Sequence, residues 1–139
     1  MRHLRTWPAA LSLLALLFLA LLAVGYASGA STARRVEIHI RYSHFEPSEV
    51  TVPRGVAVTV VLINDDPIDH EWLIGDAAFH DRHRRGTETQ HGARPNEISI
   101  PAMSTVETTL AFAETGNVRY ICHIPGHEAY GMVGTLTVE

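Results

Sequence analysis

The chain has 139 residues, which is enough for one domain and not comfortably for two. Its formal net charge of −4 gives no electrostatic footprint for nucleic acid, so nucleic-acid binding is excluded as a function. It contains a single cysteine, Cys122, which excludes an intramolecular disulfide.

Residues 1–30 differ in kind from the rest of the chain. A basic start, a Leu- and Ala-rich stretch from Ala9 to Val24 and a group of small residues predict a secretory signal peptide. The apolar stretch almost reaches the roughly 20 residues that span a bilayer, so an uncleaved membrane anchor stays open. Arg34 and Arg35 follow the stretch and mildly oppose a stable anchor. Both alternatives place residues 31–139 outside the cytoplasm, in the periplasm or at the outer face of the membrane.

Short segments of alternating or β-branched residues predict strands along the remainder of the chain. These segments are Val36–Arg41, Val50–Val52, Val56–Ile63, Glu71–Ile74, Ile98–Ile100, Thr105–Phe112, Val118–Cys122 and Val133–Val138. Their spacing, with Gly, Pro, Asn and Asp in the turns, favours an all-β sandwich or barrel. Residues 76–97 are an exception, because residues 76–85 are compatible with a short helix and a polar loop follows. A connection of that length in a β domain is often functional.

The strongest chemical signal lies between the last two predicted strands, in the segment from Tyr120 to Met132. Cys122, His127 and Met132 fall there at five-residue intervals. Thiolate and imidazole suit copper or zinc, and a thioether selects copper, so this set predicts a copper site. An electron-transfer copper site has two histidines and one cysteine with a weak axial methionine, so a second histidine must come from elsewhere in the chain. His70 is the candidate, because it follows a turn at one end of the predicted sheets, where the C-terminal loop can reach it.

With these residues in view, the chain resembles the cupredoxin family, the plastocyanin- and azurin-like blue copper proteins. Three features carry the resemblance: Asn64-Asp65-Asp66 before His70, the run Cys122-His123-Ile124-Pro125-Gly126-His127 that ends at Gly131-Met132, and Phe45-x-Pro47 through Gly55. The resemblance implies a cupredoxin-like Greek-key β-sandwich over residues 31–139. It also implies one type 1 copper ion near one end of the sandwich.

The resemblance further assigns a role to each ligand. His70 and His127 would be the equatorial imidazoles, Cys122 the thiolate that colours the site, and Met132 the distant axial ligand. The edge of His127 would be exposed and serve as the exit for electrons. The surrounding docking patch would comprise Pro125, Ala129, Tyr130 and Met132.

Two features depart from the family pattern. Many relatives carry a small hydrogen-bonding residue after the first histidine, where this chain has Glu71. The resemblance therefore does not predict the hydrogen bonds around the copper ligands at this position. The insertion after Ile74 contains His80, His83 and His91 and is similar to cupredoxin-like proteins associated with copper handling.

Each ligand also has a simpler interpretation. Cys122 can be a buried free thiol, His70 a solvated turn histidine, and Met132 an ordinary core side chain. In multicopper oxidases a histidine at the position of His123 serves a three-copper cluster. That cluster also needs His-x-His pairs, and this sequence contains none. His123 is therefore expected to be structural or exposed.

Two further groups of polar residues each allow two interpretations. His80 and His83 are three residues apart and can share a helix face, as a secondary metal site requires. The neighbouring arginines would repel a cation, so a solvated loop is favoured there. The acids around His70 either bias partner docking or line a solvated turn; these acids are Asp65, Asp66, Asp69 and Glu71.

The expected function is a monomeric one-electron carrier that cycles Cu(I)/Cu(II) with a cytochrome or another oxidoreductase. The alternative is a copper-handling protein whose cargo is copper and whose partners are other copper-handling proteins. Contact with a membrane is expected only through an uncleaved N-terminal segment. A stand-alone enzyme is rejected: nitrite reductase-like and oxidase sites need more histidines or a second copper domain, and the binuclear purple centre needs two cysteines. Zinc is the weaker choice of metal, because a thioether favours copper.

Overall fold

A computed structural model describes residues 34–86 and 94–139. The predicted signal or anchor in residues 1–30, the domain boundary after it, and His91 lie outside the described residues. Within the described residues, no helix combines the length and apolarity that crossing a membrane demands.

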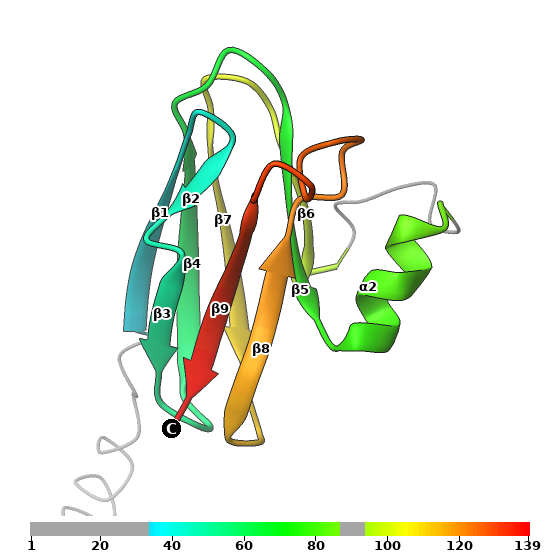
Figure 1. Cartoon of the computed structure of the whole chain (residues 1–139). Coiled ribbons are helices and arrows are strands. Elements are labelled where there is room, and N and C mark those ends of the chain that lie inside the picture. The colour runs from blue at the N-terminus through cyan, green and yellow to red at the C-terminus, as the bar shows by residue number, and fades with distance from the viewer. Residues whose placement is uncertain (1–33, 87–93) are drawn as a thin grey trace, which may run out of the picture. The chain divides into compact units, whose positions relative to one another are not determined.

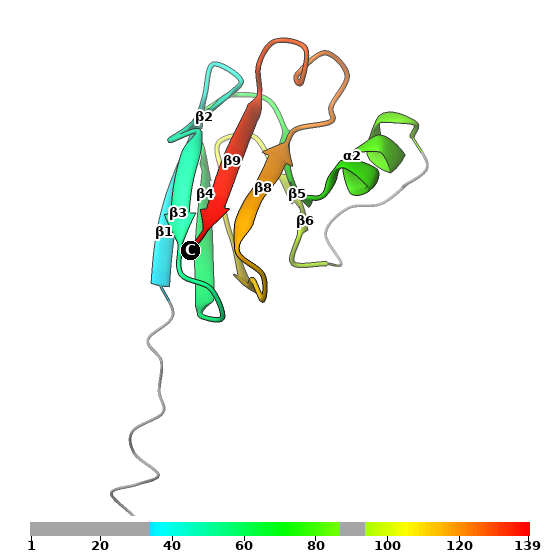
Figure 2. The same ribbon diagram turned by 60° about the horizontal axis from the view of Figure 1, so that its bottom comes forward.

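The described residues form a sandwich of two β-sheets, with one helix beside it (Figures 1 and 2). One sheet has the strand order β2-β1-β4-β7 and the other the order β3-β9-β8-β5-β6. The elements are β1 (Arg34–Arg41), β2 (His44–Glu46), β3 (Glu49–Val52), β4 (Ala57–Asn64), β5 (His70–Gly75), α2 (Ala77–Arg84), β6 (Glu97–Ile100), β7 (Thr105–Ala111), β8 (Gly116–Ile121) and β9 (Val133–Val138).

The core lies between the two sheets and follows from the alternation of apolar side chains. In β1, Ile38 and Ile40 are buried while the residues between and beyond them are more exposed, as one-sided burial of a strand requires. On the opposite sheet, Trp72 and Tyr120 are completely buried, and their rings lie 5.9 Å apart. Gly134 passes directly over the ring of Tyr120, which leaves no room for a Cβ atom. Apolar burial of this kind is the main force that holds the sandwich together.

The predicted β-sandwich is confirmed, and both sheets are mixed. β1 pairs in parallel with β4, β3 pairs in parallel with β9, and the other pairs are antiparallel. The three-residue strand β2 was not predicted. It pairs with β1 through a turn in which Tyr42 and Ser43 both have positive φ, 53° and 56°. Non-glycine residues seldom adopt this conformation, so the sequence does not predict the turn.

Antiparallel pairing of β5 with β8 places the predicted ligands at one end of the sandwich. The register pairs Leu73 with Ile121, so β5 begins at the end where β8 finishes. His70 is the first residue of β5, and Cys122 follows the last residue of β8. The β8–β9 loop lies at the same end, at the top of Figure 1. Residues more than fifty positions apart in the sequence are thereby brought together.

The helix expected within residues 76–85 is confirmed as α2. The Asp76 side chain accepts a hydrogen bond of 2.7 Å from the backbone N–H of Phe79 and caps the helix, and basic residues occupy its last turn. The Phe79 ring packs against Gly75 so closely that a Cβ atom there would collide with it. The helix stands beside β5 and β6, and its C-terminal end approaches the β8–β9 loop (Figure 1).

Candidate metal centre

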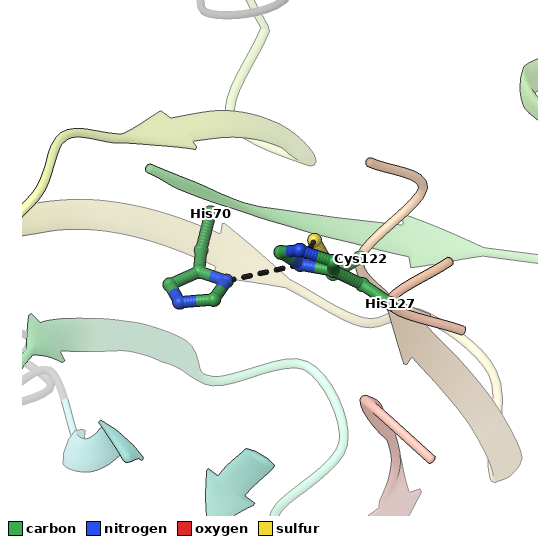
Figure 3. Close-up of side chains that lie close together, drawn as sticks. All are labelled: His70, Cys122 and His127. Carbon is green, nitrogen blue, oxygen red and sulfur yellow. Dashed lines mark hydrogen bonds between the residues drawn. The ribbon is translucent and has the colours of Figure 1, made fainter. Parts of the chain in front are cut away.

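His70, Cys122 and His127 form the group of possible metal ligands at the end of the sandwich (Figure 3). One ligand atom from each of them lies within 4.8 Å of the others. The two Nδ1 atoms of His70 and His127 are 3.2 Å apart, and Nδ1 of His127 is 3.4 Å from Sγ of Cys122. Nitrogen ligands about 2.0 Å from one ion lie about 3 Å from each other, so this donor set fits a single metal ion.

Asp66 sets the orientation of His70. Nε2 of His70 lies 3.0 Å from Oδ2 of Asp66, and because a carboxylate only accepts hydrogen bonds, Nε2 carries the hydrogen. The lone pair of the neutral ring is then on Nδ1, the atom that faces His127. A histidine ligand held through its second nitrogen is typical of metal sites.

The turn between β1 and β2 in turn holds Asp66. The backbone N–H groups of Tyr42 and Ser43 donate to its two carboxylate oxygens at 2.7 and 2.8 Å. Burial acts to raise the pKa of Asp66, but these two hydrogen bonds and the one from His70 outweigh it and hold the pKa below its ordinary value. Asp66 therefore stays ionised and keeps accepting from His70.

Asn64 ties the loop that carries Asp66 to the turn between β6 and β7. Its buried side-chain amide donates to the carbonyl oxygens of Ile68 and Pro101, both at 2.9 Å, and its Oδ1 accepts from the backbone N–H of Asp66 at 3.0 Å. A fully bonded buried amide of this kind fixes one loop conformation.

Cys122 is completely buried, and its sulfur accepts a hydrogen bond from the backbone N–H of Glu71 at 3.4 Å. The donor is a main-chain N–H group. The contact with sulfur is therefore kept although this chain has Glu71 where a small residue is usual in the family. Burial raises the pKa of the Cys122 thiol to about 11, against smaller lowering contributions from the backbone N–H groups of Ile124 and Glu71. A metal that binds there must displace a proton.

The ligand loop is closed by hydrogen bonds within its own backbone. The N–H of His127 donates to Ile124 O, and the N–H of Met132 donates to His127 O, both at 3.0 Å. Gly126 has a φ of 92°, in the left-handed region that favours glycine, which allows the tight turn at this point of the loop. The loop thus holds His127 in place through its own conformation.

Met132 lies completely buried at the end of this loop, and its carbonyl oxygen accepts from the backbone N–H of Cys122 at 3.2 Å. This position is compatible with an axial ligand, and the assignment stays a prediction. The expectation that Met132 also contributes to an exposed docking patch is wrong, because closure of the loop turns its side chain into the core. Pro125, Ala129 and Tyr130 are exposed as expected.

His127 is only partly buried, whereas His70 and Cys122 are fully covered. Burial lowers the pKa of His127, and the neighbouring His70 adds to this effect. The site therefore reaches solvent along the His127 side.

The acids around His70 do not act together. Asp66 is buried and orients His70, a role that the sequence interpretation missed. Asp65 is more exposed and accepts from Arg41 Nε at 2.8 Å, and Asp69 accepts from the backbone N–H of Ala102 at 2.8 Å. The i,i+4 spacing of Asp66 and His70 was the signal available in the sequence.

The structure also brings together three histidines outside this site. His80 and His83 are buried on α2, and Nδ1 of His80 lies 3.0 Å from Nε2 of His123. The expectation that His80 and His83 lie in a solvated loop is wrong, because α2 packs them against the ligand loop. Burial lowers the pKa of His80 and lowers that of His123 to about 4. The side chain of His123 is also buried, so it is not exposed to solvent.

A buried thiolate donor and two imidazoles at one end of a two-sheet sandwich define a mononuclear copper protein of the cupredoxin class. Residues 33–139 match the family described as copper binding proteins, plastocyanin/azurin family. The chain belongs to this family, its cofactor is copper, and it is a copper-binding protein rather than an enzyme. When bound, the ion supplies a one-electron Cu(I)/Cu(II) couple.

Two curated relatives share a description, copper-resistant cuproprotein CopI. The protein of Pseudomonas aeruginosa is 27% identical over 145 residues, which cover 81% of this chain and 80% of the relative. The protein of Rubrivivax gelatinosus is 33% identical over 98 residues, covering 68% of this chain and 59% of the relative. Among solved structures, auracyanin A, a blue copper protein of Chloroflexus aurantiacus, is 26% identical with a TM-score of 0.60, and the match covers 76% of this chain and 98% of auracyanin A.

Replacing Asp66 with alanine should lower copper affinity about 10- to 100-fold, because His70 loses the hydrogen bond that orients its ring. Competition titration with a chelator measures the change. Asp65→Ala is the matched control, since it removes a neighbouring carboxylate that does not touch His70, and it should change affinity little. Equal affinities of the two variants would contradict the role of Asp66.

Replacing Met132 with leucine should raise the reduction potential and keep the visible thiolate-to-copper band, because the loss of a weak thioether donor disfavours Cu(II) while the equatorial ligands remain. Redox titration of the purified protein followed at that band measures both quantities. Loss of all copper binding would refute the axial assignment.

Copper binding should release about one proton from the thiol, so apparent affinity should rise about tenfold per pH unit between about pH 7 and 9. The affinity rises with pH because the pKa of Cys122, about 11, leaves the metal-free thiol protonated across this range. The low pKa of His127 means that its ring adds no proton there. Calorimetry in buffers of different ionisation enthalpy counts the protons. An affinity independent of pH would mean that the thiolate already exists in the metal-free protein.

Proposed function

We propose that this protein protects its cell against excess copper by binding the ion outside the cytoplasm. The observation that carries the proposal is the similarity to the copper-resistant cuproprotein of Pseudomonas aeruginosa, which extends over about four fifths of both chains. This is the copper-handling alternative drawn from the sequence, and it is favoured here over the electron carrier. Its partners would be other copper-handling proteins, and the N-terminal signal or anchor predicted from the sequence would deliver it to the periplasm.

The chemistry of the site supports this role. A buried thiolate and two imidazoles bind copper tightly, because thiolate and imidazole are ligands that copper prefers. The partly exposed His127 gives the ion a route to solvent without opening the core. The ligand loop and the Asp66 contacts hold the donors in position before copper arrives, so little ordering is needed on binding.

A second candidate is the one-electron carrier, and one observation favours it. Four large side chains with apolar surface are exposed on loops at the copper end: Tyr42 at 89%, Tyr130 at 77%, Met103 at 69% and Ile68 at 47%. Exposed apolar side chains near a metal edge suit brief docking of a redox partner. The carrier role requires such a partner, whereas copper protection does not.

Deleting the gene should reduce growth at raised copper and leave growth at ordinary copper unchanged. Wild-type protein and Met132→Leu should restore copper tolerance, because both keep the equatorial donors, and Cys122→Ser should fail to restore it. Growth curves over a copper series measure the effect.

The opposite pattern would support the electron carrier. In that case the deletion impairs respiratory growth at ordinary copper, and Met132→Leu fails to rescue it because its reduction potential no longer matches that of the partner. Such a result would overturn the proposal of copper protection.

A further inference from the structure

A second group of imidazoles lies beside the copper ligands and is made by α2 and the ligand loop. His80 and His83 come from α2, and His123 directly follows Cys122 in the chain. The side chain of His123 is 6% exposed, and His80 and His83 are also buried, so the group is an internal feature. A buried imidazole needs partners for its polar nitrogen atoms.

Two of the rings have a nitrogen that donates to a backbone carbonyl and so carries the hydrogen, and the third has a nitrogen near a carboxylate. Nε2 of His80 donates to Arg119 O at 3.1 Å, and Nδ1 of His83 donates to Phe79 O at 2.9 Å. Nδ1 of His123 lies 3.4 Å from the Glu128 carboxylate. Histidine ligands of metals almost always donate their second N–H to a carbonyl or a carboxylate in this way. Asp66 does the same for His70 at the first site.

With the hydrogen of His123 on Nδ1, toward the Glu128 carboxylate, the lone pairs on Nδ1 of His80 and Nε2 of His123 face each other at 3.0 Å. The separation is close to the 3.2 Å between the two Nδ1 atoms of the copper ligands. Two nitrogens bound to one ion at about 2.0 Å lie about this far apart. A direct hydrogen bond between the rings would instead put the lone pair of His123 Nδ1 against the Glu128 carboxylate, which is electrostatically unfavourable.

The charges around the group permit a cation. Arg84 and Arg119 both oppose a positive charge at His80, but Arg84 is paired with Glu128 at 2.7 Å and with Asp81 at 2.6 Å, so its charge is balanced. An open hollow of about 470 Å³, lined in part by His83, His123 and Glu128, connects the His123 side of the group with solvent. A metal ion therefore has an entry path.

We propose that His80 Nδ1 and His123 Nε2 bind a second copper ion, Cu(II), in a site without thiolate. The ring of His83 is stacked on His123 with centroids 5.8 Å apart and keeps its hydrogen bond to Phe79 O, so it holds the His123 ring in position and leaves the remaining coordination positions to water. Imidazole is a preferred ligand of Cu(II). The choice of copper over other ions rests on the proposed function, in which copper is the cargo, while the site itself rests on geometry alone.

The test is a titration of the purified metal-free full chain with Cu(II). Two copper ions per chain should remain after desalting, as counted by elemental analysis. Electron paramagnetic resonance should show two signals, one with the small hyperfine splitting of a thiolate-bound copper and one with the large splitting of a nitrogen-bound copper. His80→Gln and His123→Gln should each lose the second signal and keep the visible thiolate band at full intensity.

His39→Gln combined with His44→Gln is the matched control and should keep both ions, because it removes two described histidines that belong to neither group. A wild-type chain that binds one copper ion would overturn the proposal, and so would a second ion that survives His80→Gln and His123→Gln. A second site that takes Zn(II) but not Cu(II) would overturn the assignment of copper. The visible band reports folding in every variant, and the growth experiment tests copper protection separately.

Discussion

Asp66 accepts hydrogen bonds from three donors at once: the N–H groups of Tyr42 and Ser43 and the ring of His70. Through these bonds the β1–β2 turn, the β4–β5 loop and the first residue of β5 become one unit. The imidazole cannot rotate without breaking a bond to a buried carboxylate, and such a bond is stronger than one between neutral groups. The direction of the His70 lone pair, and with it the position of the metal, depends on this contact.

The rest of the centre is built on rigid main-chain elements. Cys122 lies where β8 ends, its sulfur accepts from the backbone of β5, and the loop to Met132 is closed by backbone hydrogen bonds. Main-chain donors depend little on side-chain identity, which explains how Glu71 can occupy a position that holds a small residue in many relatives. Rigid ligands of this kind also limit the rearrangement that a change of copper oxidation state can cause.

Helix α2 links the inserted segment to the ligand loop. Its pairing of Arg84 with Glu128 and its buried histidines both contact the loop that supplies His127. Surface ion pairs contribute little to stability, so the buried rings are the more important part of this contact. The insertion therefore forms part of the metal-binding end of the molecule.

The sequence alone determined the β-sandwich, the copper cofactor and the loop from Cys122 to His127, because local spacing and turn residues specify them. It also placed His70 correctly, since alternating strands with intervening turns predict which ends meet. It did not reveal Asp66 as the residue that orients His70, nor the burial of Met132. It also did not reveal the meeting of His80 with His123, 43 residues away. Asp66 is only four residues from His70, but the distant turn at Tyr42 and Ser43 decides which of the neighbouring acids is held beside it. The meeting of His80 with His123 likewise depends on the packing of α2 against a distant loop, which local sequence does not specify.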